Sequence, residues 1–136
     1  MSQNIPLSEY ATDTMGLILY LEKRRLPQKI KAIFRQVEQG QATMHIPAFV
    51  FAEIMYLSQK ERIQISMSDV KQYLKKYINF HECPLNFATI QVAHEIDDIP
   101  ELHDRLIAAT AKYLEVTLIT NDPIIQKSSH VQTIWK

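Results

Sequence analysis

The sequence has one cysteine and two glycines among its 136 residues, and its apolar runs are too short to span a membrane. The single cysteine, Cys83, excludes an internal disulfide and a zinc site built from cysteines, and it fits a reducing cytoplasm. The low glycine count and the hydrophobic content of 46% favour a compact, regular fold over a disordered chain. Residues 1–6 lack the basic and apolar regions of a signal peptide. We therefore expect one domain spanning residues 1–136, located in the cytoplasm and not in a membrane.

The formal net charge is zero, which does not by itself indicate a nucleic-acid-binding protein, but the charges are unevenly distributed. Residues 22–35 contain six basic side chains against one acidic side chain, a local charge of +5. Residues 82–104 contain six acidic side chains and no Lys or Arg. A basic flank near an acidic centre would suit a metal-dependent enzyme that acts on a polyanion. Two ordinary solvated helix faces would produce the same pattern, and charge alone leaves both interpretations open.

Hydrophobic patterning and turn residues predict strands that alternate with helices along the chain. The predicted strands cover residues 9–13, 42–46, 80–83, 116–120 and 131–135. The predicted helices cover 14–21, 28–39, a segment that starts at Pro47, 70–78 after a Ser68-Asp69 cap, 86–95, 103–114, and a short turn after Asp122. Such alternation indicates an α/β protein, with a mainly parallel sheet covered by helices on both faces.

Four carboxylates lie in or beside apolar segments, one in each of four separate predicted elements: Asp13, Glu53, Asp104 and Asp122. Glu53 is the clearest case, because the residues three and four positions away on a helix are largely apolar: Phe49, Val50, Tyr56 and Leu57. An unpaired carboxylate on a core-facing stripe costs several kcal/mol. No Lys or Arg occurs within residues 36–59. We therefore expect a basic residue distant in sequence, or a metal ion, to reach Glu53.

The predicted topology brings these carboxylates together. In an open parallel sheet, sites form beyond the carboxyl ends of the strands, where the strand order reverses. Asp13 and Asp122 follow two predicted strands and share a crevice if those strands are neighbours. Asp104 and Glu53 would reach the same crevice from helices on either side. Carboxylates that meet in one pocket repel one another unless cations share it, and Mg²⁺ and Mn²⁺ are the natural partners of oxygen ligands.

Structural roles remain open for some of these residues. Asp13 could cap the helix that follows it, and Asp122 followed by Pro123 is a common helix start. Asp104 could stabilise a helix N-terminus through the macrodipole. The five histidines show no paired metal spacing, although His103 stands beside Asp104. The sequence has no glycine-rich phosphate loop and no context for a Ser-His-Asp arrangement.

Four motifs occur in a fixed order along the chain: Asp13-Thr14, Glu53 within a helix, the segment from His103 to Ala111, and Leu118-Ile-Thr-Asn-Asp122. In this order they resemble the PIN-domain nucleases, in particular the VapC-type toxins of toxin–antitoxin pairs. The first strand departs from the family pattern, because Tyr10-Ala-Thr12 replaces a longer aliphatic run and an extension through Ser8 precedes it. The resemblance spans nearly the whole chain, and residues 100–122 are its most specific part.

The resemblance implies a three-layer α/β/α sandwich and an endoribonuclease that depends on Mg²⁺ or Mn²⁺. It also implies that Asp13, Glu53, Asp104 and Asp122 are the catalytic, metal-binding residues and that Thr120 supports them. In this interpretation a metal-activated water hydrolyses the RNA phosphodiester. A homodimer and a cognate antitoxin that holds the toxin inactive are also implied.

We assign Lys23, Arg24 and Arg25 as candidate contacts to the RNA backbone. The alternatives to a toxin are a non-cleaving PIN-fold binding module and a housekeeping PIN nuclease. A metal-dependent phosphatase or phosphoacceptor domain is less well supported, because no nucleophilic aspartate with a nearby Lys and a phosphate loop stands out.

Overall fold

The computed structural model describes residues 7–136, so the predicted absence of a signal peptide concerns residues outside this range. Its strands form one sheet with the order β3-β2-β1-β4-β5, and every neighbouring pair is parallel. The strands are β1 (Ser8–Thr12), β2 (Ala42–Pro47), β3 (Phe80–Cys83), β4 (Thr117–Ile119) and β5 (Thr133–Ile134). The predicted parallel α/β sheet is confirmed. Strand order reverses between β1 and β4, which places the switch point between them.

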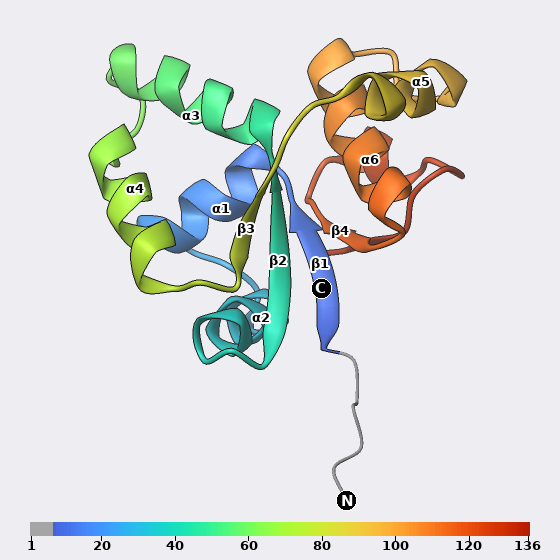
Figure 1. Ribbon diagram of the computed structural model, residues 1–136. Helices are drawn as coiled ribbons and strands as arrows, with labels where there is room; N and C mark the ends of the chain where they lie inside the picture. Colours follow the sequence, from blue (N-terminus) through green and yellow to red (C-terminus); the bar gives the residue numbers. More distant parts are fainter. Residues whose placement is uncertain (1–6) are drawn as a thin grey trace, which may run out of the picture.

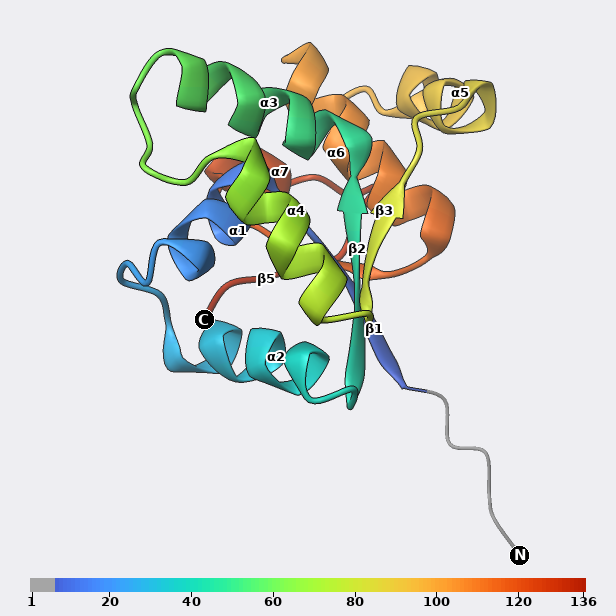
Figure 2. The same ribbon diagram turned by 60° about the vertical axis from the view of Figure 1, so that its left-hand side comes forward.

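Helices cover both faces of the sheet, as the α/β/α prediction requires. The helices are α1 (Thr14–Leu21), α2 (Gln28–Glu38), α3 (Ala48–Gln59), α4 (Met67–Lys76), α5 (Phe87–Glu95), α6 (Leu102–Leu114) and α7 (Pro123–Gln126). Figure 1 shows α1, α2 and α4 on one side of the sheet and α5 and α6 on the other. Figure 2 shows α3 running across the end of the sheet to which β2 points. Helix α3 contacts both α1 and α6 there, so three helices meet near the carboxyl ends of the strands.

The core lies on the two faces of the central strands. Its fully buried side chains come from strands and helices alike and include Leu17, Ile18, Ile30, Phe34, Met44, Ile46, Leu118 and Ile119. Helix α2 is amphipathic: Ile30, Ile33, Phe34 and Val37 are buried. It ends before Gly40, whose φ of +77° is the left-handed conformation that glycine adopts without strain.

The predicted start of the fourth helix is wrong by three residues. Ser66 caps α4, not Ser68-Asp69: its hydroxyl accepts a hydrogen bond from the Asp69 amide (3.1 Å), and the Asp69 carboxylate accepts one from the Ser66 amide (2.8 Å). This reciprocal capping box satisfies two backbone donors at once, which a cap at Ser68 would not. Helix α4 consequently begins at Met67 and ends at Lys76, and not at Ile78.

Other predicted boundaries differ from the structure by one or two residues, chiefly at strand ends. Strands β4 and β5 are shorter than the predicted 116–120 and 131–135 segments, and β1 begins at Ser8. Asn86 caps α5 as predicted, with its side chain accepting from the Thr89 amide at 2.9 Å. Within residues 7–136, no helix is both long and apolar enough to cross a membrane.

Candidate active site

A pocket of about 350 Å³ lies beyond the carboxyl ends of β1 and β4 and is lined by all four predicted carboxylates, Asp13, Glu53, Asp104 and Asp122. Asp13 follows β1, and its amide donates to the Ile119 carbonyl at the end of β4 (3.1 Å). This bond joins the two strands at the point where the strand order reverses. Strands β1 and β4 are neighbours, which meets the condition set for a crevice shared by Asp13 and Asp122, and the pocket occupies the switch point.

Both oxygens of Asp13 are held by hydrogen bonds. Oδ1 accepts from the Gly16 amide (2.8 Å), so Asp13 is the N-cap of α1, and Oδ2 accepts from the Thr120 hydroxyl (2.6 Å). The pKa of Asp13 is raised chiefly by burial, and the charges of Asp122 and Glu53 raise it further. The hydrogen bonds from Thr120 and Gly16 oppose this rise by stabilising the carboxylate. The capping role and a place in the pocket thus coexist in one residue.

Gly16 is required where it stands by close packing. A Cβ atom at Gly16 would lie 2.7 Å from the Thr12 hydroxyl oxygen and 3.1 Å from Asp13 Oδ1. The first distance is shorter than a van der Waals contact allows. A side chain at this position would therefore displace the Asp13 carboxylate or the end of β1.

Thr120 links the two strand ends. Besides donating to Asp13, its hydroxyl accepts from the Asp122 amide (3.1 Å). Asp122 then caps α7, with Oδ1 accepting from the amides of Ile124 (2.8 Å) and Ile125 (3.2 Å). The predicted supporting position of Thr120 is thus beside both aspartates. A single fully buried hydroxyl orients the two residues at the switch point.

Glu53 reaches the pocket from α3. On this helix Val50 and Ile54 are buried, whereas Glu53 is half-buried and Tyr56 is 52% exposed. The sequence suggested that Glu53 lies at the centre of the apolar stripe. In the structure it lies at the border of the stripe instead. Its Oε1 accepts a hydrogen bond from the Thr14 hydroxyl in the first turn of α1. This bond ties α3 to α1 across the pocket.

Asp104 lies in the first turn of α6, where Glu101, and not Asp104, is the N-cap. Burial raises the pKa of Asp104 to about 6, and the negative charges of Asp122, Glu101, Glu53 and Asp13 add to the effect. His103, its neighbour, packs against the Phe49 ring with centroids 4.5 Å apart and does not line the pocket. A carboxyl group that resists ionisation because it is partly buried and has other carboxylates nearby is a common feature of functional sites.

Basic partners are missing from the pocket in the described part of the chain. No Lys, Arg or His lines it, and none of the ion pairs found within residues 7–136 involves its four carboxylates. The sequence left two partners open for Glu53, a distant basic residue or a metal ion. The basic residue is not found among these residues. The donor set consists of carboxylate and hydroxyl oxygens, which suits a hard divalent ion such as Mg²⁺ or Mn²⁺.

The PIN domain family model matches residues 10–130, which include all four carboxylates. The chain belongs to the PIN domain family. PIN domains are generally nucleases and typically use divalent metal ions. No curated protein matches the chain significantly in sequence.

Several solved structures share the fold at low sequence identity. The chain resembles the VapBC2 complex of Rickettsia felis bound to a promoter DNA fragment, with a TM-score of 0.72 and 19% identity over 94% of this chain and 99% of that one. The structure of DNA-bound VapBC from Salmonella typhimurium has a TM-score of 0.70 and 14% identity, over 94% of this chain and 98% of that one. The structure of VapBC-1 from nontypeable Haemophilus influenzae has a TM-score of 0.62 and 18% identity, over 93% of this chain and 96% of that one. At these identities the likeness establishes the fold of the PIN domain.

A second group of potential ligands lies elsewhere on this PIN domain. It consists of Asp97, Asp98 and His130, whose donor atoms all lie within 4.8 Å of one another. Among residues 7–136 no three of the pocket carboxylates bring their oxygens this close together. His130 Nε2 lies 2.9 Å from Asp97, and its Nδ1 lies 3.0 Å from Lys112 Nζ. Asp98 accepts from Ser128 and Ser129, which lower its pKa. These contacts tie the loop before α6 to the segment after α7. The histidine spacing in the sequence gave no sign of this group.

The predicted basic contacts lie away from the pocket of this PIN domain. Lys23 and Arg24 line a separate cavity of about 560 Å³ beside Tyr20, Tyr73 and Tyr77, and Arg24 pairs with Glu22 at 3.4 Å. Arg25 is exposed and is not among the residues that line that cavity. They follow the end of α1 opposite Asp13, and eight helical residues span about 12 Å. Their contact with RNA stays a prediction.

Sequence reasoning missed several residues that line the pocket, among them Asn121 and Trp135. Asn121 directly precedes Asp122. Trp135 directly follows β5 and therefore lies at the same edge of the sheet as the residues that follow β1 and β4. That shared edge was the available signal, because a residue after a parallel strand faces the crevice side of the sheet.

Proposed function

We propose that this chain is an endoribonuclease toxin of a toxin–antitoxin pair, which depends on Mg²⁺ or Mn²⁺. One observation carries the proposal: four carboxylates from four elements line one pocket at the switch point, with no basic side chain among the lining residues described. Burial raises the pKa values of Asp13 and Asp104, and the charges of the neighbouring carboxylates raise them further, so the charged form of this pocket is unfavourable without cations. Divalent cations would remove this repulsion.

In this proposal Asp13, Glu53, Asp104 and Asp122 hold the metal. The ions supply a water activated for attack and charge that offsets the developing negative charge on the phosphate. The chain's own hydrogen bonds keep the ligands in place: Thr120 and Gly16 orient Asp13, Thr14 orients Glu53, and the amides of α7 orient Asp122. Asp104 has no such bond to its side chain among the described residues, so the metal would be its main partner.

An antitoxin is the proposed partner. The structures that resemble this chain include VapBC complexes, which supports the hypothesis without naming the partner of this chain. Exposed apolar side chains lie on the two helices that carry Thr14 and Glu53: Met15 on α1, which also lines the acidic pocket, is 44% exposed, and Met55 and Tyr56 on α3 are 43% and 52% exposed. Apolar surface next to an acidic pocket would suit a partner segment that buries apolar side chains and places an Arg or Lys in the pocket. The homodimer stays a prediction.

Metal dependence is the first test of the proposed activity. The purified chain should cleave structured RNA in Mg²⁺ or Mn²⁺ and lose this activity in excess EDTA, because the pocket offers no basic group to replace the ion. Gel analysis should show products with a 5′-phosphate and a 3′-hydroxyl. Restoring the metal should restore cleavage. Equal cleavage in EDTA, or products with a cyclic phosphate, would contradict the proposal.

The basic flank gives a second test. If Lys23, Arg24 and Arg25 contact phosphates, replacing all three with Gln should reduce the slope of log K against log salt by about 2, since each contact on single strands contributes about 0.7. Cleavage at saturating RNA should change little, because these residues lie away from the pocket.

The matched control for the basic flank is the replacement of Lys71, Lys75 and Lys127 with Gln. This replacement removes the same amount of charge. The three lysines are exposed, and they line neither the cavity that contains Lys23 and Arg24 nor the acidic pocket. An equal change of slope in both variants would assign the effect to overall charge. No change in the first variant would return the three residues to ordinary solvated surface.

A further inference from the structure

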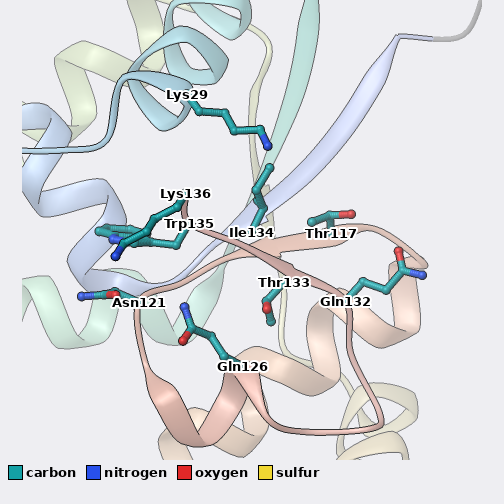
Figure 3. A pocket seen from close by; sticks show the side chains of 9 residues that line it. All are labelled: Lys29, Thr117, Asn121, Gln126, Gln132, Thr133, Ile134, Trp135 and Lys136. Atoms are coloured by element: carbon teal, nitrogen blue, oxygen red, sulfur yellow. The ribbon is translucent and has the colours of Figure 1, made fainter.

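A large cavity, distinct from the one beside Lys23 and Arg24, adjoins the acidic pocket along the edge of the sheet. Its volume is about 840 Å³, within the range of ligand pockets. Figure 3 shows Lys29 extending into it from α2 toward the end of β5, where Trp135 and Lys136 follow Ile134. The residues that line it are Lys29, Thr117, Asn121, Gln126, Gln132, Thr133, Ile134, Trp135 and Lys136.

Two residues line both this cavity and the acidic pocket: Asn121 and Trp135. The Thr120 amide donates to the Ile134 carbonyl (3.2 Å), which holds the ends of β4 and β5 side by side. Trp135 therefore stands next to the Asn121-Asp122 segment. A ligand in the large cavity would continue directly into the acidic pocket past this tryptophan.

The chemistry of the large cavity is opposite to that of the acidic pocket. Within residues 7–136, its lining contains two lysines, Lys29 and Lys136, and no Asp or Glu. Three amide side chains, on Asn121, Gln126 and Gln132, offer paired donors and acceptors, although Gln126 Nε2 already donates to the Thr120 carbonyl (3.1 Å). Trp135 is half-buried and packs against the core, so its ring is held in place.

These three kinds of group match the parts of a nucleotide. Lysines neutralise phosphates, amide side chains bond to base edges, and an aromatic ring stacks on the base. A peptide carrying Arg or Lys would meet the two lysines unfavourably. The lining therefore favours an anionic ligand with a planar, hydrogen-bonding group over a basic peptide.

We propose that this cavity binds a nucleotide of single-stranded RNA, with its base stacked on Trp135 and its phosphates near Lys29 and Lys136. The inference rests on the proposed ribonuclease function and adds a substrate class to it. The stacked nucleotide adjoins the phosphodiester that enters the acidic pocket. A base in a duplex is already paired and stacked on its neighbours, so the cavity selects unpaired segments.

Trp135 is the only tryptophan of the chain, so its fluorescence reports on the cavity without any label. We would titrate short single-stranded oligoribonucleotides and a blunt RNA duplex into the Asp104→Asn variant in the presence of Mg²⁺. Under the proposed function this substitution prevents cleavage. The single strands should quench the fluorescence saturably. The duplex should quench it weakly or not at all.

The Trp135→Ala substitution in the same background should weaken binding of labelled single strands by about five- to a hundredfold, as expected for the loss of one stacked base. Trp135→Phe keeps an aromatic face and should retain most of the affinity. Tyr113→Ala removes an exposed aromatic ring on α6, outside the cavity, and should bind normally. Circular dichroism would compare the folding of all three variants.

The outcomes separate this inference from the proposed activity. Quenching by single strands in a chain that never cleaves RNA would support the binding site while the ribonuclease function fails. Metal-dependent cleavage by the wild type, with no quenching and no loss of affinity in Trp135→Ala, would overturn the inference alone. Equal binding of duplex and single strands, or quenching only by an Arg-rich peptide, would also overturn it.

Discussion

The Asp104→Asn variant should lose metal-dependent RNA cleavage by about a hundredfold or more. Under the proposed function the substitution removes one of four negative charges that would hold the metal, and a bound metal supplies several kcal/mol of transition-state stabilisation. Each tenfold loss of rate corresponds to about 1.4 kcal/mol. Asp104 is the cleanest of the four to change, because it does not cap a helix, whereas Asp13 and Asp122 do. Initial rates at saturating Mg²⁺ would measure the effect.

The same variant should be as stable as the wild type, or more stable, when metal is removed. Burial and nearby carboxylates raise the pKa of Asp104 to about 6 from 3.8. The folded state therefore binds more protons than the unfolded state between these pH values, and stability falls as pH rises through the folded pKa. Asn carries no charge, so the variant avoids this loss, by about 1 kcal/mol after allowance for solvent screening.

Thermal unfolding in EDTA would test this pH dependence. The midpoint of Asp104→Asn relative to wild type should rise between pH 4 and pH 7, and the two proteins should differ least at the acidic end. Glu95→Gln is the matched control, since Glu95 is exposed at the end of α5 and lies outside the pocket. A clear loss of stability in Asp104→Asn without metal would instead assign Asp104 a structural role at the start of α6.

Expression of the wild-type chain alone should arrest growth of a bacterial host, and Glu53→Gln should abolish this arrest. The substitution removes a charge that would bind metal under the proposed function, but the amide oxygen of Gln can still accept the hydrogen bond from Thr14. The fold should therefore survive while the activity does not. Growth curves at matched expression, with intracellular RNA integrity measured in parallel, would record the effect.

A small partner, expected to be encoded beside this gene, should restore growth when co-expressed. An Arg or Lys from its chain would find strong charge-assisted bonds in the acidic pocket. The partner should still bind Glu53→Gln, since its contacts would extend beyond the pocket. Asp97→Asn should remain toxic. Should the wild type and Glu53→Gln prove equally harmless, a housekeeping PIN nuclease or a non-cleaving binding module would become the better hypothesis.

The fold could be predicted from local patterns because they agree with one another. Alternating strand and helix segments, Gly40 after α2 and Asn86 before α5 all appear in the structure as predicted. The start of α4 could not be chosen with the same certainty, since Ser66 and Ser68 both precede Asp69. Only reciprocal hydrogen bonding at the correct spacing selects Ser66.

The candidate site divides in the same way. The convergence of Asp13 and Asp122 was predictable, because both follow parallel strands and such ends meet at one edge of a sheet. The position of Glu53 at the border of its apolar stripe was not, because its exposure depends on how α3 packs on α1 and α6. Nor does sequence separation reveal that Asp97 and Asp98 meet His130.

The sequence by itself determined the parallel α/β class and the four acidic residues, because hydrophobic period and residue chemistry are local properties of the chain. Tertiary structure alone decided which groups share a cavity. It placed Trp135 and Asn121 where they line both the acidic pocket and the cavity that contains Lys29. It placed Lys23 and Arg24 beside three tyrosines and not beside the acidic pocket. These juxtapositions depend on strand order and helix packing, which join residues more than a hundred positions apart, as in the bond from Thr120 to Asp13.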